Sequence, residues 1–345
     1  MPSSIRKALN ELPTTLDDTY ERMLQGIPKE KFEHASRLFQ CMVAAVRPLR
    51  VEELAEIFAI DFGPNAAPNL VEGWRPENPA EAVLSTCSTL IAIIDDGCSK
   101  VVQFSHFSVK EYLTSDRLQA SNVGDIRQYY IPLVPAHTIL ARSCVTVLLQ
   151  LVEEKDQERP RSLPLESYAT ENWARHAKFE DVASRIQDSL ADIFNPKSRQ
   201  YVPPVLFRGL SEAYSPVINH FTNEPDKVTH LYLAAWCGFS GLIKHLIIIH
   251  ALDVNENLGD GYAPLHGVSW HGHVDTARIL LHHGADINAG SYYDYTPLHL
   301  ASEFGRVELT RLLLERKANV NAQTELSATP LYLGADRGYL EVVRL

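Results

Sequence analysis

The residues most suggestive of chemistry are five histidines between positions 266 and 283, namely His266, His271, His273, His282 and His283. Histidine is a common metal ligand near neutral pH, so this group is a candidate metal site. The same residues also have structural explanations. His282 and His283 lie near the end of an expected helix, where positive charge suits the helix dipole. We favour structural roles and predict no metal.

A second group could supply a nucleophile and a base. His106 lies between Ser105 and Ser108, and Cys87 and Cys98 precede it in the sequence. A serine or cysteine beside a histidine is the arrangement that nucleophilic catalysis requires. The sequence has no GxSxG elbow, however, and no defined acid to orient the imidazole. Apolar residues with core-like spacing surround the group, so we predict a packing role and no catalytic residue.

Nucleotide binding would require a P-loop, GxxxxGK[ST], whose backbone amides and lysine hold phosphate. The sequence contains no Gly-Lys dipeptide. Its nearest approach, the pair Gly267 and Gly272, is followed by His273. We therefore predict no cofactor and a protein that is not an enzyme.

Composition and charge narrow the class further. The 345 residues are 45% apolar and 22% charged, which is typical of a folded globular protein. A net charge of −11 disfavours a surface for nucleic acid. The five scattered cysteines predict reduced thiols. Because the N-terminus lacks a signal core and the apolar runs 90–94 and 246–249 are short, we expect a cytoplasmic protein without membrane contact.

The elements that position these residues are clearest in the last third of the chain, where three markers share one period. Leucines recur in steps of 34, 33 and 33 residues, at Leu231, Leu265, Leu298 and Leu331. Glycines keep the same period at Gly238, Gly272, Gly305 and Gly338. So do the triplets Asp253-Val254-Asn255, Asp286-Ile287-Asn288 and Asn319-Val320-Asn321.

The best copy of the leucine motif is Thr296-Pro297-Leu298-His299-Leu300-Ala301. This motif and period resemble the ankyrin repeat, a pair of helices with a projecting turn. Thr296 can cap the first helix, Pro297 suits its first turn, and Gly305 can end it. We expect about four repeats over residues 226–345. The fourth stops inside its second helix, so we also expect the array to continue beyond this chain.

The first two-thirds of the chain predicts a different, mainly helical architecture. Helical spacing covers residues 16–27, 31–46, 51–60 and 81–90, and the strands 91–94 and 100–104 flank the turn Asp95-Asp96-Gly97. This order indicates a winged-helix-like module within residues 1–120, followed by a helical connector over 121–225. A winged helix can bind DNA, but the acidic turn would repel phosphate, so DNA binding is a remote alternative.

Four blocks of sequence carry a second resemblance: residues 12–22, 47–54, 104–113 and 168–177. In this order, and followed by the repeats, they resemble the region C-terminal to the NACHT module in fungal NACHT–ankyrin proteins of the STAND class. The resemblance implies a signalling switch in which a NACHT module binds ATP and the repeats sense a partner. The ATP site would lie before Met1, so no nucleotide-binding residue is carried over.

We therefore favour a protein-interaction scaffold or sensor, with a piece of a STAND switch as the alternative. Ankyrin arrays bind proteins through their turns and the concave face of the first helices. The middle turn carries Tyr292, Tyr293 and Tyr295, and exposed tyrosines are frequent in binding hot spots. Trp236 and Trp270 hold equivalent positions on neighbouring inner helices, where mutual packing is the other explanation. These five residues are the predicted protein-binding site, and a small-molecule ligand is not expected.

Overall fold

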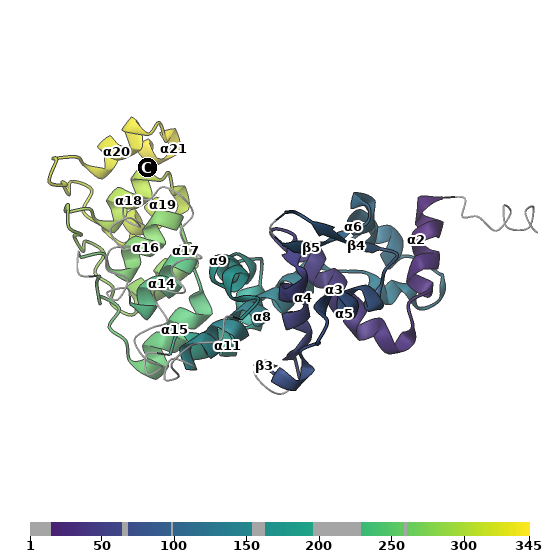
Figure 1. Cartoon of the computed structure of the whole chain (residues 1–345). Helices are drawn as coiled ribbons and strands as arrows, with labels where there is room; N and C mark the ends of the chain where they lie inside the picture. The colour runs from purple at the N-terminus through teal and green to yellow at the C-terminus, as the bar shows by residue number, and fades with distance from the viewer. Residues whose placement is uncertain (1–14, 64–67, 98, 154–162, 196–228, 259–260) are drawn as a thin grey trace, which may run out of the picture. The chain divides into compact units, whose positions relative to one another are not determined.

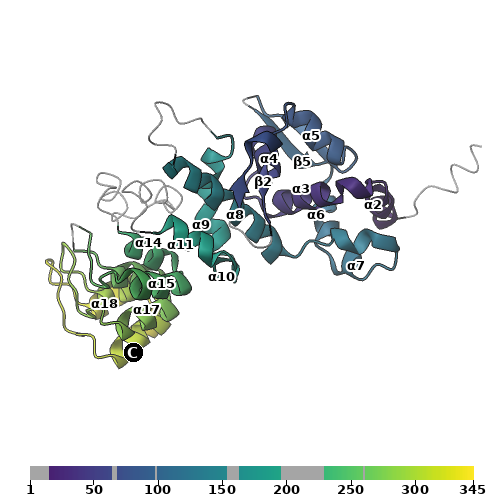
Figure 2. The same cartoon turned by 90° about the horizontal axis from the view of Figure 1, so that it is seen from below.

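The computed structural model describes residues 15–63, 68–97, 99–153, 163–195, 229–258 and 261–345. The chain divides into two compact units, both mainly helical as predicted (Figures 1 and 2). Unit 1 comprises Met1–Val147 and Arg161–Tyr168, and unit 2 comprises Leu148–Pro160 and Ala169–Leu345. The break between Val147 and Leu148 falls within a helix. The predicted boundary at 225 lies outside the described residues.

Unit 1 packs short helices around a small antiparallel sheet. The sheet has the strand order β1-β5-β4, formed by β1 (Leu49–Arg50), β5 (Lys100–Phe104) and β4 (Ile91–Asp95). A second pair joins β2 (Ile60–Asp61) to β3 (Asn69–Leu70). The helices are α2 (Leu16–Gln25), α3 (Phe32–Ala44), α4 (Val51–Phe58), α5 (Pro79–Thr86), α6 (Phe107–Leu113) and α7 (Asp116–Gln119). Helices α3 to α5 followed by the β4–β5 hairpin confirm the predicted winged helix.

Local sequence signals explain where α2 begins and how the chain turns between β4 and β5. Thr15 Oγ1 accepts a hydrogen bond from Asp18 N at 3.1 Å, and Asp18 Oδ2 accepts one from Thr15 N at 3.0 Å, so a capping box begins α2. The β4–β5 turn contains Gly97 at φ 86°, a conformation that favours glycine. Asp95 Oδ1 accepts from Gly97 N at 2.9 Å, which keeps a carboxylate at the tip of the hairpin. Cys98 lies outside the described residues.

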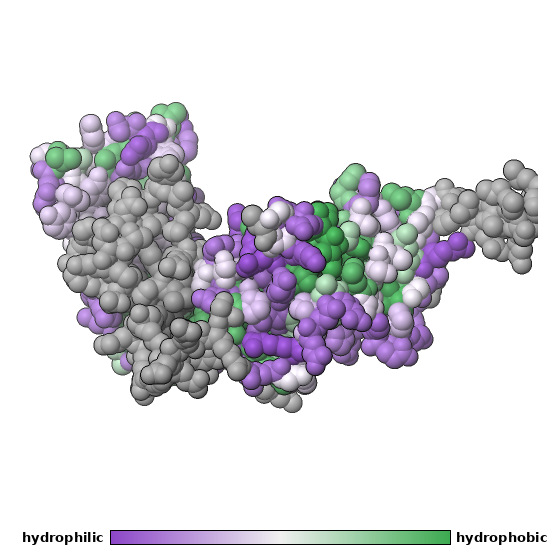
Figure 3. Space-filling view, viewed as in Figure 1, coloured by the Kyte–Doolittle hydropathy of each residue, from purple (hydrophilic) through white to green (hydrophobic). Residues whose placement is uncertain are grey.

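The surface of unit 1 carries an apolar area. In Figure 3 hydrophobic atoms gather where Figure 1 labels β4, β5 and α6. Exposed apolar side chains of these elements include Ile94 and Phe107, the latter 71% exposed.

Helix α8 (Leu133–Glu153) is the longest described helix and runs from unit 1 into unit 2. By length and composition alone, its stretch Leu133–Leu151 could cross a membrane. Half of this stretch is buried inside the protein, and the core helix of a soluble protein passes the same test, so this is weak evidence for a span. A search of the sequence for uninterrupted apolar runs does not find this helix, because Arg142 lies in its middle.

Unit 2 begins with connector helices that pack against the first repeat. They are α9 (Glu166–Ala177), α10 (Val182–Arg185) and α11 (Gln187–Ile193), and residues 196–225 of the predicted connector lie outside the described residues. The Trp173 ring lies 6.0 Å from that of Phe194 and 6.1 Å from that of Phe239. Trp173 is fully buried, so the connector and the first repeat share one core.

The repeats are four pairs of helices. They are α14 (His230–Cys237) with α15 (Ser240–His250), α16 (Pro264–His271) with α17 (Val274–His282), α18 (Pro297–Glu303) with α19 (Val307–Glu315), and α20 (Pro330–Asp336) with α21 (Leu340–Val343). Thr229, Thr296 and Thr329 cap the first helix of their pairs, as predicted for Thr296. The motif leucine is 0–2% exposed in the first three pairs but 56% exposed at Leu331 in the fourth.

The recurring glycines allow adjacent repeats to approach each other. Gly305 has φ 64°, which favours glycine, and a side chain there would lie 2.5 Å from the ring of Tyr339 in the next repeat. Gly238 likewise has φ 77° and lies beneath the ring of His273. The period of the glycines therefore reflects both a left-handed backbone and a close contact between repeats.

Candidate protein-binding surface

The motif histidines of the second and third repeats join each of these two repeats to the next one. His266 Nδ1 accepts a hydrogen bond from Ala263 N at 3.0 Å. Because Nδ1 is an acceptor, the ring proton lies on Nε2, which is 3.0 Å from Ala289 O and 2.9 Å from Tyr295 O. His299 forms equivalent bonds one repeat later. Both ring nitrogens are thus used within the array.

The histidine cluster has the electrostatics of a buried structural group. Burial lowers the pKa of His266 to about 4, although its three backbone hydrogen bonds oppose the shift. Burial and the charge of Lys178 lower the pKa of His271 to about 3 and that of His273 to about 4. His282 and His283 are exposed at the end of α17. Within the described ranges, no three His, Cys, Asp or Glu side chains gather as a metal site.

The possible nucleophile and base do meet, but at the start of a helix. His106 Nδ1 lies 2.5 Å from Ser108 Oγ, and Ser108 Oγ lies 2.6 Å from the hydroxyl of Tyr20. Ser108 N also donates to His106 Nδ1, which makes this imidazole the cap of α6. Ser105 Oγ instead bonds to Thr89 O. The geometry is that of a capped helix packed on α2.

The described cysteines have the character of core residues. Cys41, Cys87, Cys144 and Cys237 are all free and buried. Burial raises the pKa of the Cys41 thiol to about 12 and that of Cys237 to about 11. A thiol needs its thiolate form to act as a nucleophile, so burial disfavours this role for these two cysteines.

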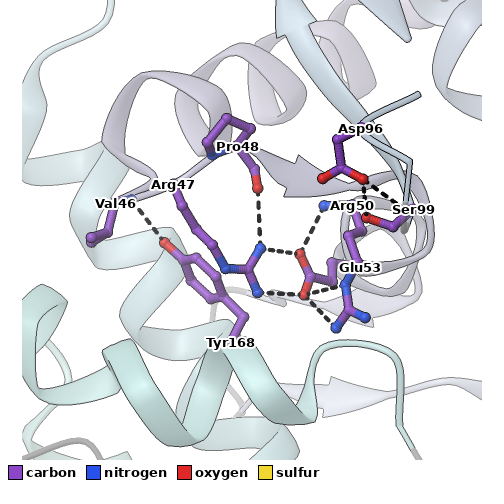
Figure 4. A network of polar contacts seen from close by, with 8 residues as sticks. All are labelled: Val46, Arg47, Pro48, Arg50, Glu53, Asp96, Ser99 and Tyr168. Carbon is purple, nitrogen blue, oxygen red and sulfur yellow. Dashed lines mark hydrogen bonds and ion pairs between the residues drawn. The ribbon is translucent and has the colours of Figure 1, made fainter. Parts of the chain in front are cut away.

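Two of the sequence blocks that resemble NACHT–ankyrin proteins meet in one polar network within unit 1 (Figure 4). Glu53, whose side chain is 1% exposed, accepts bonds from both terminal nitrogens of Arg47 at 2.8 and 2.7 Å. Its carboxylate also accepts from Arg50 N at 2.8 Å and Arg50 Nε at 2.9 Å. The Tyr168 hydroxyl accepts from Val46 N at 3.2 Å, and the Arg47 guanidinium lies 5.0 Å from the Tyr168 ring centre. These contacts between the blocks therefore contribute to the fold of unit 1.

The third periodic marker forms a ladder along the projecting turns. Asn255 Oδ1 accepts from Asp286 N, and Asn288 Oδ1 accepts from Asn319 N, each at 2.8 Å. Within its own turn, Asn288 N donates to Asp286 Oδ1 at 2.9 Å. Each asparagine thereby fixes the spacing between its turn and the next one.

The predicted tyrosine turn projects two aromatic side chains from this fixed base. Tyr292 and Tyr293 are 63% and 53% exposed, and their rings meet edge to face at 4.7 Å. The backbone of the turn is closed by a bond from Ser291 N to Tyr295 O at 3.0 Å. Tyr293 O also accepts from Glu325 N in the next turn at 3.1 Å. Tyr295 is only partly exposed and packs near His299.

The inner helices carry a row of aromatic rings. The Trp236 and Trp270 rings lie 5.8 Å apart, and the Trp270 and Phe304 rings lie 4.0 Å apart. Trp236 is only 2% exposed, so it serves packing in this structure, whereas Trp270 and Phe304 are partly exposed. Phe304 was missed from the sequence. It holds the place just before Gly305, and that position relative to the periodic glycine was the available signal.

Two models of protein families match parts of these two units. A model of ankyrin repeats matches three overlapping stretches, residues 210–291, 231–324 and 290–345. The winged helix domain described for GPI inositol-deacylase matches residues 20–123. The chain thus carries a winged-helix domain of that type and C-terminal ankyrin repeats.

A curated relative matches most of the chain. Azaphilone pigments biosynthesis cluster protein L of Monascus ruber is 28% identical over 289 residues, which are 79% of this chain and 60% of the relative. The chain therefore spans less than two-thirds of that protein's length.

Proposed function

We propose that this winged-helix and ankyrin-repeat chain is a non-catalytic scaffold or sensor that binds a protein partner. Ankyrin repeats generally mediate protein–protein interaction. The partner would bind the concave face, at Trp270 and Phe304, and the turn that carries Tyr292 and Tyr293. Trp236 packs beside Trp270, and Tyr295 closes the backbone of the tyrosine turn.

The observation that carries this proposal is the exposed pair Tyr292 and Tyr293. Large aromatic side chains that remain exposed and are held in one backbone conformation provide contact area with little loss of entropy on binding. Bonds at both ends of the turn and to the next turn hold this pair in place. Rigid exposed aromatics of this kind are typical of binding anchors.

A finer proposal concerns the protein to which these domains belong. We propose a cytoplasmic signalling role of the STAND type, with ATP binding located in a NACHT module outside this sequence. Two observations support this proposal. The four blocks occur in the order found in that family, and contacts around Glu53 and Ser108 bring the blocks together in pairs. The purified chain should then neither bind nor hydrolyse ATP. Measurable hydrolysis that survives further purification would contradict this assignment.

The relative's place in a pigment biosynthesis cluster suggests a fungal secondary-metabolism setting.

The binding proposal can be tested with peptides selected from a random displayed library by the full chain. Joint replacement of Tyr292, Tyr293 and Trp270 by alanine should weaken binding of the selected peptides by more than about 2 kcal/mol, the scale of a hot spot. Fluorescence anisotropy with labelled peptides gives the dissociation constants.

The matched control removes an exposed aromatic residue elsewhere. Trp74, which is 54% exposed in unit 1, is replaced by alanine and should leave affinity unchanged. Melting curves confirm that both variants remain folded. Equal affinity of the triple variant and the wild-type chain would overturn the proposed surface.

A further inference from the structure

Basic side chains gather where the connector meets the first three repeats. Lys178 follows α9 and Arg306 precedes α19, while His271 and His273 lie at the turn between α16 and α17. Arg306 Nε donates to Trp270 O at 2.9 Å, and the rings of His271 and His273 stack at 5.5 Å. We call Lys178, His271, His273 and Arg306 the basic cluster, whose positive charges near neutral pH are those of Lys178 and Arg306.

Among the residues that the structure describes, the two permanent charges of the cluster have no salt-bridge partner. Lys178 is exposed and Arg306 is partly exposed, and neither forms a salt bridge with any described residue. After burial, the charges of Lys178, His273 and Arg306 are the groups that lower the pKa of His271. No carboxylate acts on His271 or His273 in the opposite direction. In a chain with a net charge of −11, these two cations thus form a positive spot that no described carboxylate pairs with.

This positive spot adjoins the partly exposed aromatic pair. Arg306 is bonded to the backbone of Trp270, and the Trp270 ring lies 4.0 Å from the Phe304 ring. Cations beside an apolar surface can bind a carboxylate and an apolar side chain of one ligand at the same time.

The character of the groove changes along the array. The position held by Trp236 and Trp270 is occupied by Glu303 in the third repeat and Asp336 in the fourth. Glu303 pairs with Arg337 at 2.7 Å, and Asp336 is exposed. A polyanion such as single-stranded nucleic acid, which needs a continuous basic path, would be repelled at this end. A peptide with locally placed acidic residues would not.

We propose that the basic cluster together with Trp270 and Phe304 binds an acidic peptide segment of a partner protein, with an apolar or aromatic side chain beside its carboxylates. This inference rests on the proposed scaffold function and specifies the chemistry of its partner. The carboxylates contact Lys178 and Arg306, and the apolar side chain packs on the two rings.

The test uses the full chain and a random dodecapeptide library displayed on phage. We expect the selected peptides to be enriched in Asp and Glu next to an aromatic or aliphatic residue. Lys178→Glu should raise the dissociation constants of these peptides at least tenfold. The control Lys244→Glu makes the same charge change at an exposed position on α15 and should leave them within about twofold.

Each outcome decides the matter. Selected peptides without acidic enrichment, or acidic peptides that bind Lys178→Glu as tightly as the wild-type chain, overturn the proposed chemistry but leave the scaffold standing. No selection of peptides by the folded chain overturns both. Tighter binding of a single-stranded oligonucleotide, lost in Lys178→Glu, would assign the cluster to nucleic acid instead.

Discussion

The two units use polar contacts over different distances in the sequence. In unit 1 the bond between Tyr20 and Ser108 joins residues 88 apart, and that between Val46 and Tyr168 joins residues 122 apart. In unit 2 the bonds between repeats join residues only 23 to 37 apart. Unit 1 is therefore one network in which each contact occurs once, whereas unit 2 repeats the same contacts between neighbours. A lost contact should affect all of unit 1 but only adjacent repeats of unit 2.

The strongest test of this contrast is Glu53→Gln in unit 1. It places an amide among the donors of Arg47 and Arg50 and removes a buried charge, which we expect to lower the free energy of unfolding by about 3–4 kcal/mol. Hydrogen exchange should quicken throughout unit 1 and remain unchanged in the repeats. Glu52→Gln, an exposed neighbour on α4, is the control. Faster exchange confined to α4 would contradict a single network.

The same contrast explains what the sequence could predict. The repeats could be predicted from the sequence because each contact recurs with the period of the chain. The motif, the Thr296 cap and the periodic glycines were therefore assigned correctly. Helices α2 to α5 and the hairpin of unit 1 were also predicted, since they depend on local spacing. The network around Glu53 was not predicted, because nothing local shows that Tyr168 lies beside Arg47. Burial likewise decides the candidate site: Trp236 and Trp270 hold equivalent positions, yet only Trp270 reaches the surface.

A second prediction compares two leucines that hold the same motif position in unit 2. Leu298 is 2% exposed between repeats, so Leu298→Ala should lower the free energy of unfolding by about 3 kcal/mol. Leu331 is 56% exposed in the fourth repeat, and Leu331→Ala should cost less than about 1 kcal/mol. Urea unfolding followed by circular dichroism gives both values. Similar losses at the two positions would mean that position in the motif, rather than burial between neighbours, determines stability.

Acid should loosen unit 2 before unit 1. In the described part of unit 2, five histidines have lowered pKa values. In the described part of unit 1, His137 alone among the histidines has a lowered pKa. His266 has a folded pKa of about 4 and an unfolded value of 6.5, so the unfolded chain binds the proton first. The stability it contributes is complete above pH 6.5 and is lost as pH falls towards 4.

For His266 alone the expected loss between pH 7 and pH 5 is about 2 kcal/mol. His266→Gln removes this titration, so its urea midpoint should fall less steeply over that interval than the wild-type midpoint. His282→Gln, at an exposed position, is the control and should keep the wild-type slope. A variant of His266 with the full wild-type slope would show that other groups cause the acid sensitivity of the repeats.

The smallest effect should come from the ladder of asparagines between turns. Asn288→Ala removes the acceptor for Asn319 N, an exposed hydrogen bond worth about 1 kcal/mol. Asn321→Ala changes the same position in the last turn and should cost less, since the described structure has no following turn for its side chain to contact. Because the ladder joins neighbours only, hydrogen exchange should quicken at the turn of Asn319 and stay unchanged at that of Asn255. Faster exchange along all the turns would show that the repeats share the long-range coupling attributed here to unit 1.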